Sequence, residues 1–257
     1  MPRMPALFIG HGSPFNLIMD NPFTKDLRML RDQLDKPKAI VLISAHWMTS
    51  GTQFTVDDRP KQIFDFYGFP KRLYDAKYEP RGDPGLAKDL VNALSNTNAS
   101  VSNEWGIDHA ATIPLIHLFP DANVPVVEMS LDMSLSPERH RQLGKTLSDF
   151  RDKGILFVGS GNLIHTFREL KQEWDTAPFD WAKDYDAMQW KAIEENSQET
   201  LVHFERDPIS RRAFQTTEHY LPMIYILGMR RENDNLRCIH EGFQHGSISH
   251  RSFIFEE

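Results

Sequence analysis

The chain has 257 residues, with 29 Lys or Arg against 36 Asp or Glu, so its formal net charge is −7. Apolar residues make up 40%, which is typical of a globular protein and excludes the disordered and fibrous classes. The acidic balance argues against nucleic acid and anionic membranes as partners, because both are usually bound through a basic face. The single cysteine, Cys238, excludes an internal disulfide and favours a cytoplasmic location.

Apolar runs are short throughout the chain. The longest, at 39–45 and 221–228, fall well below the ~18 residues that a membrane-spanning helix needs. The stretch 6–9 is shorter than the roughly 7–15 apolar residues of a signal-peptide core, so we expect no secretory leader. Since repeats, low-complexity tracts and long polar linkers are also absent, residues 1–257 are interpreted as one domain.

Strand patterns alternate with helix patterns along the chain. Short apolar runs predict buried strands at 6–9, 39–44, 124–129 and 155–159. Capping and amphipathic patterns predict helices at 84–94, 137–153, 181–204 and 217–229. This alternation predicts an α/β fold whose largely parallel sheet is covered on both faces, with edge strands at 236–240 and 247–255.

Three histidines follow predicted strands. His11 follows the first strand in IGHGSP, His46 follows the second in SAHW, and His165 follows the fourth in GSGNLIH. Ligands of open α/β sheets bind beyond the carboxyl ends of the strands, so these imidazoles meet if the strands are parallel neighbours. Each alone has the simpler interpretation of a surface histidine, but three at one topological position favour a shared site.

Two further histidines are candidates for the same site. His219 lies in TTEHYLP and His109 in WGIDHA. The alternatives are a solvent-facing His219 at a helix start and a loop His109 bonded to Asp108. The remaining histidines are interpreted as structural, with the first two in this list solvated on charged helices: His140, His203, His117, His240, His245 and His250.

Imidazole clusters suit Zn, Cu, Fe and Ni, whereas Mg and Ca prefer oxygen ligands. The chain has no CxxC pair, HExxH, GxxxxGK[ST], GxGxxG or GxSxG motif, so the common zinc-finger, zinc-protease, nucleotide-binding and serine-hydrolase sites are unsupported. Two other groups near the strands are open to a binding role or a structural one. The basic group is Arg59, Lys61, Arg72 and Lys77, and the aromatic group is Phe66, Tyr67 and Phe69.

Five motifs occur in one order: HGSP at 11–14, SAHW at 44–47, WGIDHA at 105–110, SGNLIH at 160–165 and EHYLP at 218–222. Together they resemble the LigB-like (class III) extradiol ring-cleavage dioxygenases, and within them the 4,5-DOPA extradiol dioxygenase type. The resemblance covers nearly the whole chain. It implies a single three-layer α/β/α domain with a mixed, largely parallel central sheet.

The resemblance also implies roles for the histidines. His11, His46 and His219 fall on the metal ligands and His165 on the acid/base residue. His109 falls on a second catalytic histidine that either contacts the substrate or lies behind the metal ligands. Fe(II) is the expected catalytic metal, with a catechol such as DOPA and O₂ as substrates. The wider superfamily has a carboxylate as third ligand where this chain has His219, beside Glu218, so Zn(II) is also a plausible bound metal, with His165 as a fourth ligand when substrate is absent.

Two other functions remain open from the sequence. One is a zinc-dependent hydrolase using the same site, with His165 or Glu218 as the base. The other is a non-enzymatic binding protein like the Memo-type members of the superfamily. The substituent on the catechol and the oligomeric state are not determined by the sequence.

Overall fold

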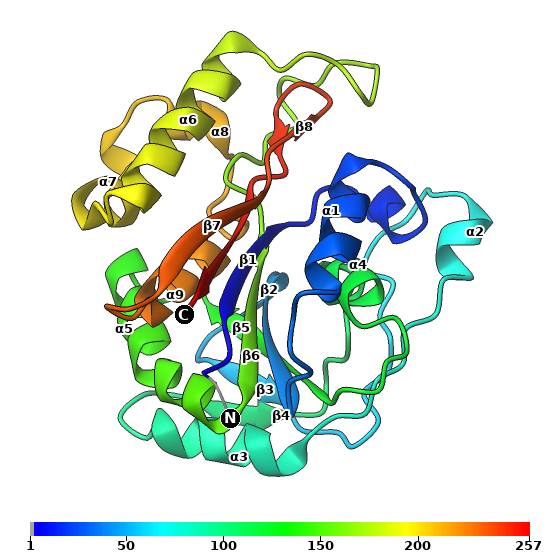
Figure 1. The fold of residues 1–257 in the computed structure, drawn as a ribbon, viewed down its shortest axis with the longest axis vertical. Helices are drawn as coiled ribbons and strands as arrows, with labels where there is room; N and C mark the ends of the chain where they lie inside the picture. The colour runs from blue at the N-terminus through cyan, green and yellow to red at the C-terminus, as the bar shows by residue number, and fades with distance from the viewer. Residues whose placement is uncertain (1–2) are drawn as a thin grey trace.

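The computed structural model describes residues 3–257, and its centre is an eight-stranded mixed sheet (Figure 1). The strand order is β4-β3-β5-β2-β6-β1-β10-β7, with parallel pairing at β3/β4, β2/β5, β2/β6 and β1/β6. The strands of this sheet are β1 (Ala6–Gly10), β2 (Ala39–Thr49), β3 (Gln53–Thr55), β4 (Ser100–Ser102), β5 (Val126–Asp132), β6 (Ile155–Gly161), β7 (Asn235–His240) and β10 (Ser252–Glu256). A separate hairpin pairs β8 (Phe243–Gln244) with β9 (Ile248–Ser249).

Helices cover both faces of the sheet (Figure 1). They are α1 (Pro22–Arg31), α2 (Lys71–Tyr74), α3 (Pro84–Ala93), α4 (His109–Leu118), α5 (Pro137–Leu147), α6 (Asp180–Glu194), α7 (Gln198–Val202), α8 (Ser210–Ala213) and α9 (Leu221–Met229), with 3₁₀ turns η1 (Pro14–Leu17), η2 (Ser148–Lys153) and η3 (Phe204–Arg206). Helices α1 and α4 pack on one face, and α3, α5, α6 and α9 pack on the other. The predicted three-layer α/β/α architecture is confirmed. In residues 3–257, no helix is long and apolar enough to cross a membrane.

Alternation within the strands forms the two cores. In β1, Ala6 and Phe8 face one core while Leu7 and Ile9 face the other, as the two-residue repeat of a strand requires. All four are fully buried, which is typical of a central strand in a sheet covered on both faces.

The structure confirms the order of the predicted elements and corrects several boundaries. Strand β2 runs five residues past the predicted end at 44, with an irregular stretch between Ile43 and Met48. The single helix predicted over 181–204 is wrong, because Asn196 takes a positive φ of 51° and separates α6 from α7. Asparagine tolerates this left-handed conformation better than most residues, and it ends the helix.

Two predictions near the C-terminus also change. The helix predicted from Thr217 begins at Leu221, because the Thr217 carbonyl accepts hydrogen bonds from the backbone N–H groups of Tyr220 and Leu221 in a turn. The segment 247–255 is divided between β9 and β10, and β10 lies between β1 and β7 rather than at an edge. Only β7 is the edge strand that was predicted there.

The strands that precede or contain the first three candidate histidines are neighbours. Strands β2, β6 and β1 are adjacent and parallel, so their carboxyl ends lie at one edge in the middle of the sheet. The prediction that His11, His46 and His165 converge depends on this arrangement, and the fold confirms it.

Candidate active site

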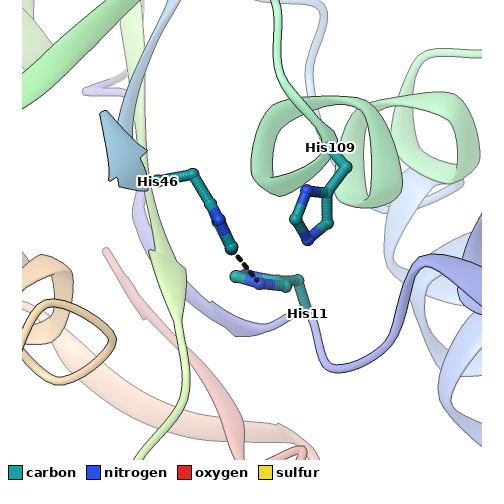
Figure 2. Close-up of side chains that lie close together, drawn as sticks. All are labelled: His11, His46 and His109. Atoms are coloured by element: carbon teal, nitrogen blue, oxygen red, sulfur yellow. Dashed lines mark hydrogen bonds between the residues drawn. The ribbon is translucent and has the colours of Figure 1, made fainter. Parts of the chain in front are cut away.

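All five candidate histidines line one cavity of about 450 Å³ at the carboxyl edge of the sheet. Figure 2 shows three of them, His11, His46 and His109, which form a compact group with ligand atoms within 4.8 Å of one another. A second group of the same kind contains His165, Glu218 and His219. The two groups line the same cavity, and the His219 ring lies 4.9 Å from the His46 ring and 5.4 Å from the His11 ring between centroids.

His11 leaves the end of β1 into a tight turn. Gly12 follows it with a φ of 63°, a left-handed conformation that favours glycine, and a Cβ there would lie 2.2 Å from the His250 ring. His11 Nδ1 is 3.0 Å from Ser160 Oγ, and Ser160 Oγ donates its own proton to the Ala110 carbonyl at 2.6 Å. The hydroxyl oxygen therefore accepts from His11 Nδ1–H, which leaves the lone pair on Nε2.

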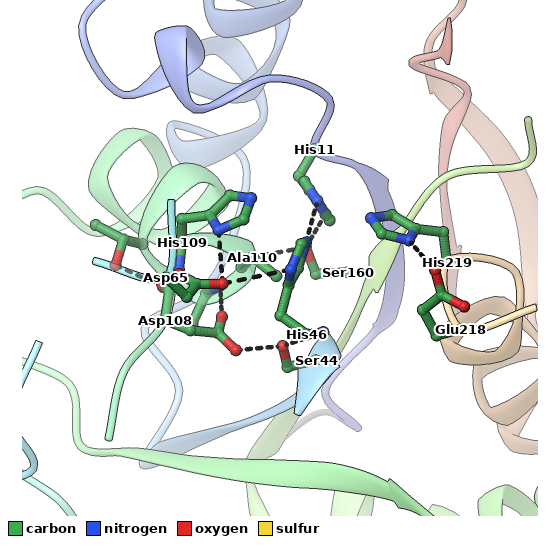
Figure 3. Close-up of polar contacts among 12 residues, drawn as sticks. His11, Ser44, His46, Asp65, Asp108, His109, Ala110, Ser160, Glu218 and His219 are labelled. Atoms are coloured by element: carbon green, nitrogen blue, oxygen red, sulfur yellow. Dashed lines mark hydrogen bonds and ion pairs between the residues drawn. The ribbon is translucent and has the colours of Figure 1, made fainter. Parts of the chain in front are cut away.

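His46 lies in the irregular stretch of β2. Its Nδ1 is 3.3 Å from Asp65 Oδ2, and the same oxygen is 2.8 Å from His109 Nδ1 (Figure 3). The Asp65 backbone is in an irregular segment between β3 and α2. One carboxylate thus orients two imidazoles with their Nε2 atoms free to face the cavity.

His109 is the first residue of α4 and not a loop residue. Asp108 is the N-cap of this helix and accepts the backbone N–H of Ala111, while its other oxygen accepts from Ser44 Oγ at 2.5 Å. The alternative in which His109 bonds Asp108 is therefore wrong, because Asp65 holds that ring. Glu128 accepts the backbone N–H of Asp108 at 3.2 Å. Burial, followed by the nearby Asp108 carboxylate, raises the pKa of Glu128 well above its usual range.

His219 comes from the turn before α9 and is buried, so the solvent-facing alternative is wrong. Gly161 allows this approach, because a Cβ on it would lie 2.0 Å from the His219 carbonyl, which accepts the Asn162 N–H at 2.8 Å. His219 Nδ1 donates to Glu218 Oε1 at 3.2 Å (Figure 3). Its Nε2 is buried with no hydrogen-bond partner in the part of the chain that the structure describes.

This donor set fits a metal ion. His11, His46 and His219 each bond an oxygen through Nδ1 and leave Nε2 as a free lone pair. The Nε2 atoms of His11 and His46 are 3.4 Å apart, which is about the separation of two nitrogens that bind one tetrahedral ion at ~2.1 Å. An unpartnered Nε2 on His219 adds a third such donor, and a buried polar atom without a partner is costly unless a ligand occupies it.

Four of these imidazoles, those of His11, His46, His165 and His219, have a lowered pKa and are neutral near pH 7. Burial lowers the pKa of His46 to about 4. Burial, followed by repulsion from the neighbouring imidazoles, lowers the pKa of His11, His165 and His219 well below the usual value. Neutral imidazole is the form that binds metals, so the site needs no deprotonation before it takes one.

His165 lies against His219. The two rings are parallel within 6° with centroids 3.5 Å apart. The lone pairs of stacked rings lie in two separate parallel planes, so one ion cannot lie in the plane of both rings, although both residues belong to the second group of possible ligands. The geometry favours His165 as a proton-transfer group beside the metal site over its role as a fourth ligand.

The other wall of the cavity is aromatic and apolar. Phe66 and Phe69 line this wall, which supports the binding role that the sequence left open for them. Tyr67 of the same group is 91% exposed and does not line the cavity. His245, interpreted as structural from the sequence, also lines the cavity. His140 is not solvated but buried, because its Nδ1 bonds the Tyr225 hydroxyl at 2.8 Å.

Sequence reasoning missed Asp65, which is the acceptor for two of the imidazoles. It also missed Trp174 and Phe15, which line the outer part of the cavity. None of the three belongs to a strand-end histidine motif, and Asp65 and Trp174 lie outside regular secondary structure, so no periodicity marks them.

Comparison with known proteins gives one family across the chain. Residues 5–256 match the family described as the catalytic LigB subunit of aromatic ring-opening dioxygenase. The chain is 39% identical over 253 residues to a protein of Escherichia coli (strain K12) named 4,5-DOPA dioxygenase extradiol, covering 96% of this chain and 93% of that one. A Beta vulgaris protein of the same name is 34% identical over 258 residues, covering 97% and 96%. The crystal structure of an uncharacterized protein from Escherichia coli K12 matches with a TM-score of 0.84 at 35% identity, covering 98% of this chain and 99% of that one.

Proposed function

This chain belongs to the LigB family of aromatic ring-opening dioxygenases, and we propose that it is an extradiol enzyme that inserts both atoms of O₂ into a catechol. DOPA is the substrate in the names of its relatives. The observation that carries the proposal is the set of three imidazoles, His11, His46 and His219, whose Nδ1 atoms are held by oxygens and whose Nε2 atoms face one cavity. The single cysteine supports a reducing, cytoplasmic setting.

These three histidines would hold the metal. When bound, Fe(II) supplies the redox chemistry of O₂ activation and open positions for both catechol oxygens. Zinc would fit the same nitrogen donors but has no redox chemistry, so a zinc-loaded protein should be inactive as a dioxygenase. The three neutral ligands leave the charge of the cation uncompensated, which favours the binding of a catechol in its deprotonated form.

His165 is the proposed acid/base group. Burial keeps its ring neutral near pH 7, so a ring nitrogen accepts the proton of a catechol hydroxyl and later returns it to an oxygen of the product. Its stacking on His219 holds it at the edge of the metal site. His109 faces the same cavity with its Nδ1 fixed by Asp65, which leaves Nε2 to contact a substrate oxygen.

The test is anaerobic loading with Fe(II), followed by a panel of catechols in an oxygen-electrode cell. We expect O₂ uptake together with a yellow ring-opened product, and neither from the zinc-loaded protein. Ester and amide substrates offered to the zinc-loaded protein test the hydrolase alternative. If the iron-loaded protein consumed no O₂ with any catechol, DOPA included, the proposal would be wrong.

A further inference from the structure

The outer cavity has an uncharged wall. Apart from the histidines, the residues that line it are aromatic, aliphatic or small, and no Lys, Arg, Asp or Glu of residues 3–257 is among them. The large members come from distant parts of the chain: Phe15, Phe66, Phe69, Phe167, Leu170, Trp174 and Ile248. A binding site for a charged substituent would need a counter-charge here, because a buried charge is costly unless it is paired.

Two charged side chains beside this wall, those of Lys171 and Glu169, have partners elsewhere, and Arg168 of the same loop is exposed. Lys171 donates through Nζ to the Ala177 carbonyl at 2.6 Å and lies over the Phe179 ring. Glu169 accepts two hydrogen bonds from Arg212, at 2.6 and 2.7 Å. Neither charge is directed at the cavity, so the loop after β6 presents its apolar side chains to the ligand.

The basic residues considered from the sequence do not reach the site either. Arg59, Lys61 and Lys77 line a separate cavity, and Arg72 is exposed. The catechol-binding cavity thus lacks the guanidinium or ammonium group that would recognise a substituent carboxylate.

The cavity is larger than one catechol ring. Catechol has eight non-hydrogen atoms, which at roughly the ~30 Å³ of a water molecule each take about half of the 450 Å³. The remaining space is lined by aromatic rings that contact one another edge-on, Phe15 with Trp174 at 5.7 Å and Phe15 with Phe69 at 5.2 Å between centroids. A substituent of several carbon atoms or a second ring would pack there.

We propose that this site selects catechols with an uncharged, apolar or aromatic substituent and disfavours substituents with a carboxylate, an ammonium group or both, as in DOPA. The inference rests on the proposed dioxygenase function and narrows its substrate class. The histidines would bind the two catechol oxygens at the metal, and the aromatic wall would contact the substituent on the catechol ring.

The test compares substituents of equal length on the iron-loaded protein. 4-Propylcatechol is neutral, 3-(3,4-dihydroxyphenyl)propionate is anionic, dopamine is cationic and DOPA is zwitterionic. We expect kcat/KM for 4-propylcatechol to exceed each of the others by at least ten-fold, mainly through KM. Equal or higher values for DOPA or the propionate would overturn the inference while the dioxygenase proposal stood. If the iron-loaded protein took up no O₂ with any of the four or with any other catechol, the proposed function would be overturned instead.

A substitution at an exposed lining residue, Leu170, tests whether the charge of the wall or its shape determines which substrates are preferred. Leu170 is 42% exposed, so Leu170→Lys adds a cation without burying it in the core. We expect this change to raise the ratio of propionate to propylcatechol turnover by about ten-fold, and Leu170→Met to keep the wild-type order of substrates. Arg168→Ala removes an exposed cation of the same loop that does not line the cavity, and it should also keep that order. Loss of propionate or DOPA turnover in Arg168→Ala would mean that a mobile guanidinium binds the carboxylate and would overturn the inference.

Discussion

The two ends of the central strands bury polar side chains in opposite ways. At the amino end, Arg151 is fully buried, and its guanidinium donates to Asp234 at 2.6 and 2.9 Å and to three backbone carbonyls. At the carboxyl end, His219 is nearly as buried, at 4% exposure, but its Nε2 has no hydrogen-bond partner in residues 3–257. The guanidinium of Arg151 is bonded within the protein and stabilises the fold, whereas His219 keeps a free nitrogen among the histidines that line the cavity.

The largest effect is expected from the ligand histidines. His219→Ala should abolish stoichiometric binding of Fe(II) or Zn(II), and O₂ uptake with it, because it removes the buried donor without a protein partner. His109→Ala is the matched control from the compact histidine group and should retain the metal while turnover falls. Metal analysis after gel filtration measures the metal content of both variants. Metal loss in His109→Ala but not in His219→Ala would show that His109 is the ligand and His219 is not.

His165→Ala is expected to lower kcat by about 10²–10⁴, the usual contribution of a general acid/base, with metal content unchanged. His165→Gln should not restore the rate, because an amide transfers no proton at neutral pH. Turnover and metal content are measured on the same samples. A variant that lost its metal would instead show that His165 is a ligand.

The amino end should respond through stability rather than activity. Arg151→Met leaves the Asp234 carboxylate buried with a single distant cation, Arg3 at 3.8 Å, and should lower the free energy of unfolding by about 3–5 kcal/mol. The double variant with Asp234→Asn should recover part of that loss. Urea unfolding of the metal-free proteins measures both, and metal affinity of the folded fraction should stay at the wild-type value.

Asp65→Asn tests the carboxylate shared by His46 and His109. The amide oxygen is a weaker acceptor than the carboxylate, so we expect metal affinity to fall by about 10–100-fold while the fold is kept. Burial opposes the ionised form of Asp65, but its hydrogen bonds and the nearby imidazoles lower its pKa overall. Unchanged metal affinity, measured by competition with a chelator, would contradict a positioning role.

The smallest effect, taken per pH unit and per residue, is a pH dependence of stability. Burial lowers the pKa of His140 to about 4 and of His250 to about 3, so both are neutral in the folded protein. Unfolding returns each to the usual value near 6.5, where it takes up a proton as the pH falls. Their contribution is therefore complete above pH 6.5, and the free energy of unfolding of metal-free protein should fall by about 1.4 kcal/mol per pH unit for each histidine below it.

His140→Gln should lower the slope of the free energy of unfolding against pH by about 1.4 kcal/mol per pH unit between pH 6 and pH 4.5, because one fewer proton is taken up on unfolding. Urea titrations at several pH values provide the measurement. A slope identical to that of the unsubstituted chain would show that His140 is not buried as a neutral group.

The amino-acid sequence alone determined the order of the four main predicted strands and of the helices between them, and it placed His11, His46 and His165 toward the carboxyl ends of three of those strands. Alternation, N-caps such as Asp83 and Ser136, and Gly154 at the end of η2 are local features, so local patterns predict them. Helix α4 has no visible period because it is apolar on nearly every side. Helix α1 was also not predicted, although it is amphipathic and Asn21 caps it.

Only the tertiary structure decided which groups surround the histidines. Asp65 reaches two imidazoles from an irregular segment, and the turn with His219 fits against β6 because Gly161 lacks a Cβ. The aromatic wall combines Phe15, Phe69 and Trp174, which are far apart in the chain. Such contacts depend on how distant segments pack, and a single sequence records the propensity of each segment but not the distance between two of them.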